Sequence, residues 1–319
     1  MGNAGLHNAV VNGFGILGKV GREKGCYKVA EGKKWVRKTG DPAAVLWARL
    51  QAKTHCAAQG YPWLEQTYTA KDGAPYVFAD GAYFEMTDRF LLPEVDLTDQ
   101  SQFLHAAEAL AHWHKACQAV AFTAGAVPRQ QPKDLTKQSR SDADALQRIR
   151  KRLRKCSGLS EFDVLFIKHY DFYAARIQQA GEIFTDTQYE ARRQAACARG
   201  QLVHGALKED CMLVEAAQNA VYITKWDNIR HDHPITDLCA LFRRRQKKAA
   251  PSAEAQAEAL AAYQAVVPLN ADEVSALTAM LLYPAPFVAI VAEYYQKKRS
   301  WTPIALINKM EEVLALDGL

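Results

Sequence analysis

The chain lacks the cysteine patterns of disulfide frameworks and of common zinc sites. Its seven cysteines are spread along 319 residues, and no Cys-x-x-Cys pair occurs among them. Secreted disulfide scaffolds and structural zinc sites both concentrate cysteines at short, regular spacings. We therefore expect a protein that folds in a reducing compartment, with neither disulfides nor bound zinc.

Long apolar runs are also missing. The most apolar stretch, residues 279–292, is interrupted by Pro284 and Pro286 and is shorter than the roughly 20 residues that a membrane span needs. No Lys or Arg precedes the short apolar run near the N-terminus, which argues against a secretory signal. We expect no membrane span.

Positive charge is only slightly in excess over negative charge. The net charge is +5 and the pI is about 8.7, so composition points to no nucleic acid and to no other particular partner. The basic residues concentrate in two runs, at 148–155 and 243–248. Both runs are interpreted as solvated helix faces, and the alternative is that they dock to acidic partner surfaces.

The hydrophobic share of 49% is enough for a large core in two lobes or in one large domain. Strand patterns dominate the first 90 residues and include a hairpin over residues 76–88 that turns at Asp80-Gly81. Helical patterns dominate from Thr98 onwards. These patterns predict an α+β protein with two lobes. The small antiparallel-sheet N-terminal lobe covers residues 1–90, and the larger, mainly helical C-terminal lobe covers residues 91–319.

Local signals predict where individual helices begin. Asp41 precedes Pro42 and is the expected N-cap of the first helix after the sheet, and Thr98 is the expected N-cap of a helix to residue 120. Further helices are expected over 142–155 and 160–180. Residues 270–273, Asn-Ala-Asp-Glu, form a capping-box pattern.

Two polar loops stand out in the second half of the chain. The stretch 201–214 reads as a short strand, a loop from His204 to Cys211 and a second strand. A polar turn then leads to the apolar run 221–223, which ends at Lys225-Trp226-Asp227-Asn228. We expect the two loops to lie side by side at the ends of paired strands.

This layout resembles the catalytic face of small-molecule kinases of the aminoglycoside-phosphotransferase and choline-kinase type. In those kinases the first loop carries an Asp that orients the attacking hydroxyl and an Asn that holds a metal, and the second carries a magnesium-binding Asp. His204-Gly205 matches the family's His-Gly-Asp motif, but Ala206, Cys211 and Lys225 occupy the three functional positions. None of these residue types can orient a hydroxyl or bind magnesium well.

The same resemblance implies a vestigial nucleotide pocket. Its residues would be Arg37, Met86, His204, Asp210, Lys225 and Asp227. Arg37 or Lys38 would replace the phosphate-binding Lys of the small lobe, and backbone groups near Met86 would meet an adenine. The helix that normally supplies a Glu to anchor that Lys has no Asp or Glu between residues 42 and 64.

A polar run after the second loop has the composition of a metal site. His231, Asp232, His233 and Asp237 lie close in sequence. Because a proline and a helix start follow, we interpret the run as structural and expect no metal there, with Asp237 satisfying loop amides and the helix N-terminus.

The pattern Leu281-Leu282-Tyr283-Pro284-x-Pro286-Phe287 is followed by Tyr294-Tyr295 and by Lys298-Arg299-Ser300-Trp301-Thr302-Pro303. Together with the helix over 106–114 and the run over 232–238, these residues are similar to the CotS family of bacterial spore coat proteins, and the resemblance covers nearly the whole chain. It implies a kinase-like fold, synthesis in the mother-cell cytoplasm, later residence in the spore coat, and other spore coat proteins as partners.

Together these observations predict a pseudokinase of the spore coat, with a structural or assembly role in sporulation and no cofactor. The alternative is a divergent small-molecule phosphotransferase or a nucleotide-binding module that uses Asp210 or Asp227, and only that alternative requires ATP and magnesium. In either case, we expect Lys225 to pair with Asp210, Asp227 or Glu209, or else to point to solvent.

Overall fold

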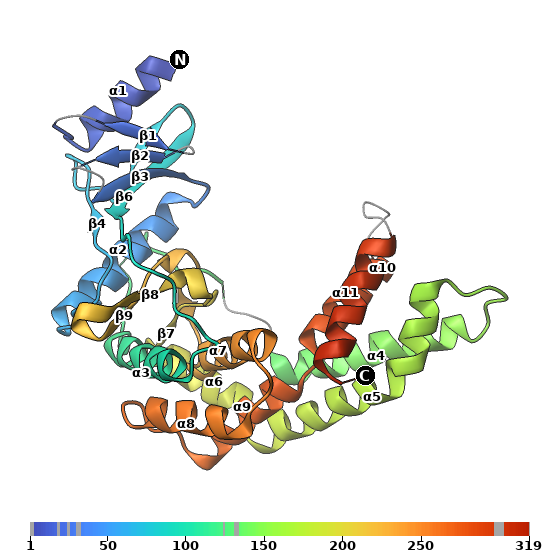
Figure 1. The fold of residues 1–319 in the computed structure, drawn as a ribbon. Coiled ribbons are helices and arrows are strands. Elements are labelled where there is room, and N and C mark those ends of the chain that lie inside the picture. Colours follow the sequence, from blue (N-terminus) through green and yellow to red (C-terminus); the bar gives the residue numbers. More distant parts are fainter. Residues whose placement is uncertain are drawn as a thin grey trace. The chain divides into compact units, whose positions relative to one another are not determined.

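A computed structural model of the chain describes residues 3–17, 20–23, 26–29, 33–123, 125–130, 134–296 and 303–318 (Figure 1). Part of one expected feature lies outside these residues: residues 298–302 of the C-terminal pattern. The chain forms two compact units. Unit 1 comprises Met1–Gln131, Ala196–Leu241 and Ser252–Pro268, and unit 2 comprises Pro132–Ala195, Phe242–Pro251 and Leu269–Leu319. The expected boundary between two lobes at residue 90 stays a prediction, because the two compact units divide the chain at other residues.

An antiparallel sheet dominates the beginning of unit 1. Its strands are β1 (Gly21–Glu23), β2 (Cys26–Val29), β3 (Lys34–Thr39), β4 (Thr67–Tyr68), β5 (Val77–Ala79) and β6 (Ala82–Asp88). Within the described residues they form a six-stranded sheet in the order β1-β2-β3-β6-β4, with β5 also paired to β6. The predicted hairpin is confirmed: Ala79 pairs with Ala82, and Asp80 and Gly81 turn with positive φ angles of 51° and 72°.

One face of this sheet has its own apolar core. Helix α1 (Asn3–Gly13) contacts β5, and its Val10 and the following Phe14 are buried with Tyr27, Val36 and Phe84 of the strands. Gly13 lies so close to Val77 that a Cβ there would come within 2.5 Å of its side chain. The sequence signals had not predicted α1, because residues 3–13 carry a weak apolar stripe among glycines.

The remainder of unit 1 combines helices with short strand pairs. The helices are α2 (Ala43–Ala58), α3 (Gln100–Ala116), part of α6 (Tyr189–Ala198), the first half of α7 (Ile235–Lys248) and α8 (Ala253–Gln264). The strands are β7 (Leu202–Val203), β8 (Met212–Glu215), β9 (Ala220–Ile223) and β10 (Arg230–His231). Strand β7 pairs with β10 and β8 with β9, so the pairing expected around the two polar loops is confirmed.

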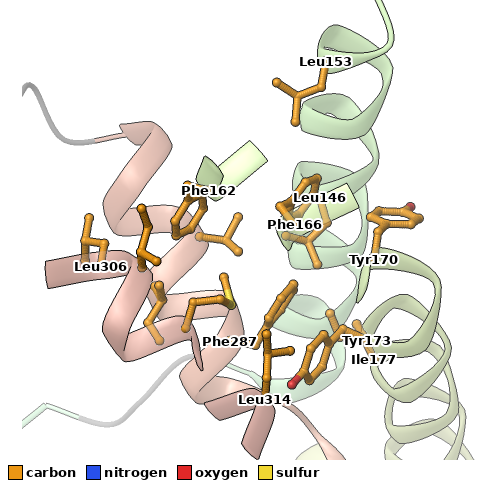
Figure 2. Packing of buried hydrophobic residues seen from close by; sticks show 14 residues of the cluster. Leu146, Leu153, Phe162, Phe166, Tyr170, Tyr173, Ile177, Phe287, Leu306 and Leu314 are labelled. Atoms are coloured by element: carbon orange, nitrogen blue, oxygen red, sulfur yellow. The ribbon is translucent and has the colours of Figure 1, made fainter. Parts of the chain in front are cut away.

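Unit 2 is built from helices around an aromatic core (Figure 2). Its main helices are α4 (Leu135–Leu153), α5 (Glu161–Asp186), α9 (Ala271–Leu282), α10 (Ala285–Gln296) and α11 (Pro303–Leu316). Tyr173 of α5 stacks on Phe287 of α10 with ring centroids 3.8 Å apart, and Phe166 lies against the same ring. The aromatic pattern near Pro284 that marks the C-terminal signature therefore supplies core residues.

Several predicted helix starts are confirmed and others are wrong. Asn270 and Glu273 form the expected capping box, and Ser160 forms another at the start of α5. Helix α3 is capped by Asp99 rather than Thr98, because the Asp99 carboxylate accepts from Gln102 N–H. Helix α4 starts at residue 135 rather than 142, since Asp134 caps it.

Among the described residues, no single helix has both the length and the apolar composition to cross a membrane; the pair α9 and α10, bent by 42°, passes that test only when joined.

Candidate functional site

Asp237, in the first turn of α7, holds the start of the first loop. Its side chain is 2% exposed and accepts hydrogen bonds from the backbone N–H groups of His204, at 2.6 Å, and Gly205, at 3.0 Å. The His114 imidazole lies 3.1 Å from the same carboxylate. Burial raises the pKa of Asp237, but the hydrogen bonds from His114 and the loop hold that pKa below its usual range. The predicted role of Asp237 is confirmed.

His204 and Trp226 connect the two loops through buried rings. His204 Nε2 donates to the carbonyl oxygen of Thr224 at 2.9 Å, and the ring is fully buried. Trp226 is also fully buried, donates from Nε1 to the Ile223 carbonyl at 2.8 Å, and lies edge-on to Trp113. His204, which matches the kinase motif, and Trp226 are therefore each held by a hydrogen bond within the chain.

The two loops lie side by side, as predicted. The Thr224 N–H donates to the Cys211 carbonyl at 2.8 Å. Lys225 Nζ lies 2.6 Å from Asp210 Oδ2, so the predicted pairing of Lys225 with a neighbouring carboxylate is confirmed. The two side chains are 38% and 43% exposed, so the pair is only partly buried. Burial raises the pKa of Asp210, but Lys225 holds it below its usual range.

Cys211 and Ala206 line the first loop without offering a metal ligand. Cys211 Sγ points toward Asp210 Oδ1, 3.4 Å away. Burial and then the Asp210 charge raise the pKa of the Cys211 thiol to about 12, so the thiol is neutral at physiological pH. Cysteine binds metals as the thiolate, which this environment disfavours. Ala206 contributes only a methyl group where the family has a carboxylate.

Asp227, at the end of the second loop, pairs with arginines from the sheet and from α2. Its Oδ1 lies 2.7 Å from Arg37 Nη2 and 3.2 Å from Arg49 Nη1. Burial raises the pKa of Asp227, but the charges of Arg37 and Arg49 bring it below its usual range. The two positive charges beside the Asp227 carboxylate are therefore supplied by the chain itself.

Glu85 of β6 completes this network from a fully buried position. Its Oε2 accepts from Arg49 Nη1 at 2.6 Å and from Arg37 Nη2 at 3.4 Å. Arg49 also binds Asp41, which is held by Arg129 as well. Four residues later on the same helix, Lys53 binds Glu65 at 2.9 Å. Helix α2 therefore carries buried cations where kinase-like folds place a Glu, and the carboxylates come from the sheet and loops.

This network corrects one expectation and adds residues that sequence reasoning missed. Asp41 does not cap α2: Pro42 is the N-cap residue, without a side-chain hydrogen bond, and Asp41 binds arginines instead. Arg49 and Glu85 were not predicted. A signal was present, because Arg49 and Lys53 are four residues apart on the apolar face of a helix that contains no acid.

The geometry of the strands decides where the side chains of the remaining predicted pocket residues lie. Arg37 and Lys38 point to opposite faces of β3, and only Arg37 reaches the second loop, while Lys38 is exposed. Met86 lies opposite Val36 of β3 and Tyr68 of β4, and its side chain belongs to the core of the sheet. Its backbone is flanked by strands on both sides, which favours a role in the sheet over contact with an adenine.

The acidic and histidine-rich run after the second loop has structural contacts. Asp232 binds Arg230, His231 Nδ1 bonds the Gln201 carbonyl, and Asp237 holds the first loop. Within the described residues, no group of three His, Cys, Asp or Glu side chains is arranged to hold a metal ion.

The family of the chain follows from comparison with known proteins. The family model "Spore coat putative kinase YutH" matches residues 39–317. The chain belongs to this family. It is also 24% identical over 258 residues to spore coat protein S of Bacillus subtilis (strain 168), covering 79% of this chain and 71% of that protein. The resemblance to CotS-type proteins is confirmed, and the family places the chain among spore coat proteins.

Solved structures share the fold. An aminoglycoside phosphotransferase from Alicyclobacillus acidocaldarius subsp. acidocaldarius DSM 446 has a TM-score of 0.83 at 15% identity, covering 100% of this chain and 92% of that one. A spectinomycin phosphotransferase bound to AMP has a TM-score of 0.64 at 12% identity, covering 98% and 97% of the two chains. The predicted kinase-like α+β fold, with a small antiparallel sheet followed by a mainly helical part, is therefore confirmed.

Proposed function

We propose that this spore coat kinase-like protein is a pseudokinase with a structural or assembly role in the spore coat. The observation that carries the proposal is the internal neutralisation of both carboxylates at the loops: Arg37 and Arg49 pair with Asp227, and Lys225 pairs with Asp210. Cations of the chain stand where phosphoryl transfer needs a metal ion.

The chemistry of phosphoryl transfer supports this view. Positioning of the attacking group and clamping of phosphates by metal are each worth orders of magnitude in rate. Ala206 cannot orient a hydroxyl, and Cys211 is held as a neutral thiol. Lys225 places an ammonium at a metal position, so that a dication there would be repelled. We expect no cofactor and no magnesium-dependent turnover.

The cellular part of the proposal comes from the family. We infer synthesis in the mother-cell cytoplasm and assembly with other spore coat proteins. A fluorescent fusion followed through sporulation should appear first in the mother cell and then around the spore. A fusion that stays diffuse in the mother cell contradicts the coat role and leaves the chemistry of the loops untouched.

The alternative is a divergent phosphotransferase or nucleotide-binding module in which Asp210 or Asp227 holds a metal. To do so, the metal would displace Lys225 from Asp210 or two arginines from Asp227. In a non-catalytic version, Lys225 would instead meet a phosphate directly.

Thermal unfolding in the presence of ATP, with and without magnesium, separates these functions. The proposal expects no shift in melting temperature that depends on magnesium, and no hydrolysis of ATP. A shift with ATP alone favours nucleotide binding through Lys225. Turnover that disappears in Asp210→Ala or Asp227→Ala refutes the proposal, and Asp210→Ala is the cleaner variant because that side chain is half-exposed.

A further inference from the structure

Helices α4 and α5 of unit 2 form a long antiparallel hairpin (Figure 1). The helices approach closely near their base, where a Cβ on Gly181 would come within 2.8 Å of Ser139 Oγ. The turn between Leu153 and Glu161 lies at the opposite end. The two ends of the hairpin differ in charge, and neither end takes part in the two loops of unit 1.

The end next to the turn is strongly basic. Residues 148–168, here called the basic tip, contain seven Lys or Arg and two Asp or Glu. The tip residues Arg148, Lys151, Arg154 and Lys155 are exposed, and none has an ionic partner among the described residues. Two apolar side chains of the tip, Leu159 and Val164, are 44% and 52% exposed.

The end next to the base carries a groove of about 510 Å³ between the two helices, here called the acidic groove. Its floor is apolar and includes Ala143, Tyr170, Ala174 and Ile177. Its rim carries three carboxylates and one guanidinium, from Asp144, Glu182, Asp186 and Arg140. The groove therefore suits an occupant with positive charges around a small apolar centre.

The basic tip and the acidic groove share one face of α4. Groove residues Arg140, Asp144 and Gln147 are spaced by four and three residues, and the same spacing continues to Lys151 and Arg154. Residues at such spacings lie along one stripe of a helix. From Asp144 to Lys151 the stripe rises about 10 Å, at 1.5 Å per residue. Negatively and positively charged side chains therefore lie at different heights along one surface of the hairpin.

We propose that two copies of this chain associate through this surface, with the basic tip of each seated in the acidic groove of the other. Two hairpins laid antiparallel about a two-fold axis near Gln147 bring each tip onto the partner's groove. Such an isologous contact is closed, because the same patch is used on both copies. Leu159 and Val164 would cover the apolar floor while the Lys and Arg side chains meet the rim carboxylates.

A second copy fits better than an unrelated acidic protein because the chain carries both halves of the contact. A purely acidic partner would satisfy the tip and leave the groove open. The inference goes beyond the proposed function and does not rest on it, since a dimer can form whether or not the loops bind nucleotide.

Sedimentation of the full chain over a concentration series tests the proposal. We expect a monomer–dimer equilibrium whose dissociation constant rises at least about tenfold when salt is raised from about 0.05 M to about 0.5 M, since exposed charges are screened. A chain that stays monomeric at low salt throughout the series overturns the inference.

Charge reversal identifies the surface. The tip variant Lys151→Glu with Arg154→Glu and the groove variant Asp144→Lys with Glu182→Lys should each raise the dissociation constant about 100-fold or more, because like charges then face each other. Mixing the two variants should restore dimers, since each reversed tip meets a reversed groove and each native tip a native groove. Joining all four substitutions in one chain should also restore them.

The matched control is Lys115→Glu with Lys247→Glu, which reverses two exposed charges outside the hairpin. It should leave the dissociation constant within about threefold of the parent, because distant exposed charges are screened. Circular dichroism checks that every variant remains folded. A dimer that all variants form equally, or reversed variants that fail to pair on mixing, contradicts the proposed surface.

Discussion

The residues that frame the two loops differ in burial and in bonding from the ion pair between Lys225 and Asp210. His204, Trp226 and Asp237 are at most 2% exposed, and each makes hydrogen bonds within the chain. Lys225 and Asp210 are more than a third exposed and bind mainly each other. His204 matches the kinase motif, whereas Lys225 departs from it at a partly exposed position and Cys211 departs from it at a buried one.

This contrast shows what folding alone requires of such loops. A buried polar group that loses its partner costs free energy, so the frame cannot change one residue at a time. Partly exposed positions are stabilised by water and tolerate exchange. Exchange of residues at such positions is therefore compatible with an intact fold, provided that the buried charges remain paired.

The largest effect is expected for Glu85→Ala. It removes the fully buried carboxylate of the network and leaves, among the described residues, Arg49 with Asp41 and Asp227 and Arg37 with Asp227 alone. Removing one partner of a buried ion pair costs about 3–5 kcal/mol. Tryptophan fluorescence during urea unfolding measures this, because Trp35, Trp47, Trp63, Trp113 and Trp226 lie in unit 1. Glu108→Ala, which removes an exposed carboxylate, is the control and should change little. Equal stability of the two variants would show that the network is hydrated.

Asp237→Asn should come next, lowering the free energy of unfolding by about 2 kcal/mol at pH 7, as expected for hydrogen bonds to a charged group. The pKa of Asp237 is lower in the folded state than in the unfolded chain. Its contribution is therefore fully present above the unfolded value of about 3.9 and is lost as pH falls through the lower folded value. Urea unfolding of parent and variant should differ most above about pH 5, and the difference should shrink as pH falls below about 3.9 towards the lower folded pKa. A constant difference across this range would exclude the carboxylate's ionisation as the cause.

Restoring the family pattern should destabilise the protein moderately. In Ala206→Asp, Cys211→Asn, Lys225→Asp, two new carboxylates join Asp210 and Asp227 while one ammonium is lost. We expect about 1 kcal/mol of destabilisation in chelator, because like charges at partly exposed positions repel weakly. Magnesium should recover part of the loss. If the triple variant is as stable as the parent in chelator, the former metal position is open to solvent, and repulsion between its carboxylates does not lower the stability.

Lys225→Ala should have the smallest effect, within about 0.5 kcal/mol, because water replaces the ammonium beside the exposed Asp210. Lys225→Gly removes the same pair but also relieves a left-handed backbone, since Lys225 has φ 58°. It should therefore be more stable than Lys225→Ala by up to about 1 kcal/mol. Thermal unfolding of both variants separates the side-chain contribution from the backbone contribution; the reverse order would contradict a strained backbone at this position.

Much of the fold was predictable because its signals are local. The Asp80-Gly81 turn, the Asn270 capping box and the strand–loop–strand pattern around His204 each depend on a few neighbouring residues. Predictions failed where two nearby groups competed for one role. Asp99 rather than Thr98 caps α3, and Asp41 binds Arg49 instead of capping α2.

By itself, the sequence determined which side chains the two loops carry, with Ala206, Cys211 and Lys225 at the three positions compared with the kinase motifs. It also determined the helix and strand periods, because side-chain order along the chain sets them. Only the tertiary structure decided which charges neutralise one another. Arg37 and Asp227 are 190 residues apart, and Arg49 and Glu85 are 36 apart. Burial in a shared, poorly solvated space makes their pairing obligatory, and no local pattern encodes that distance.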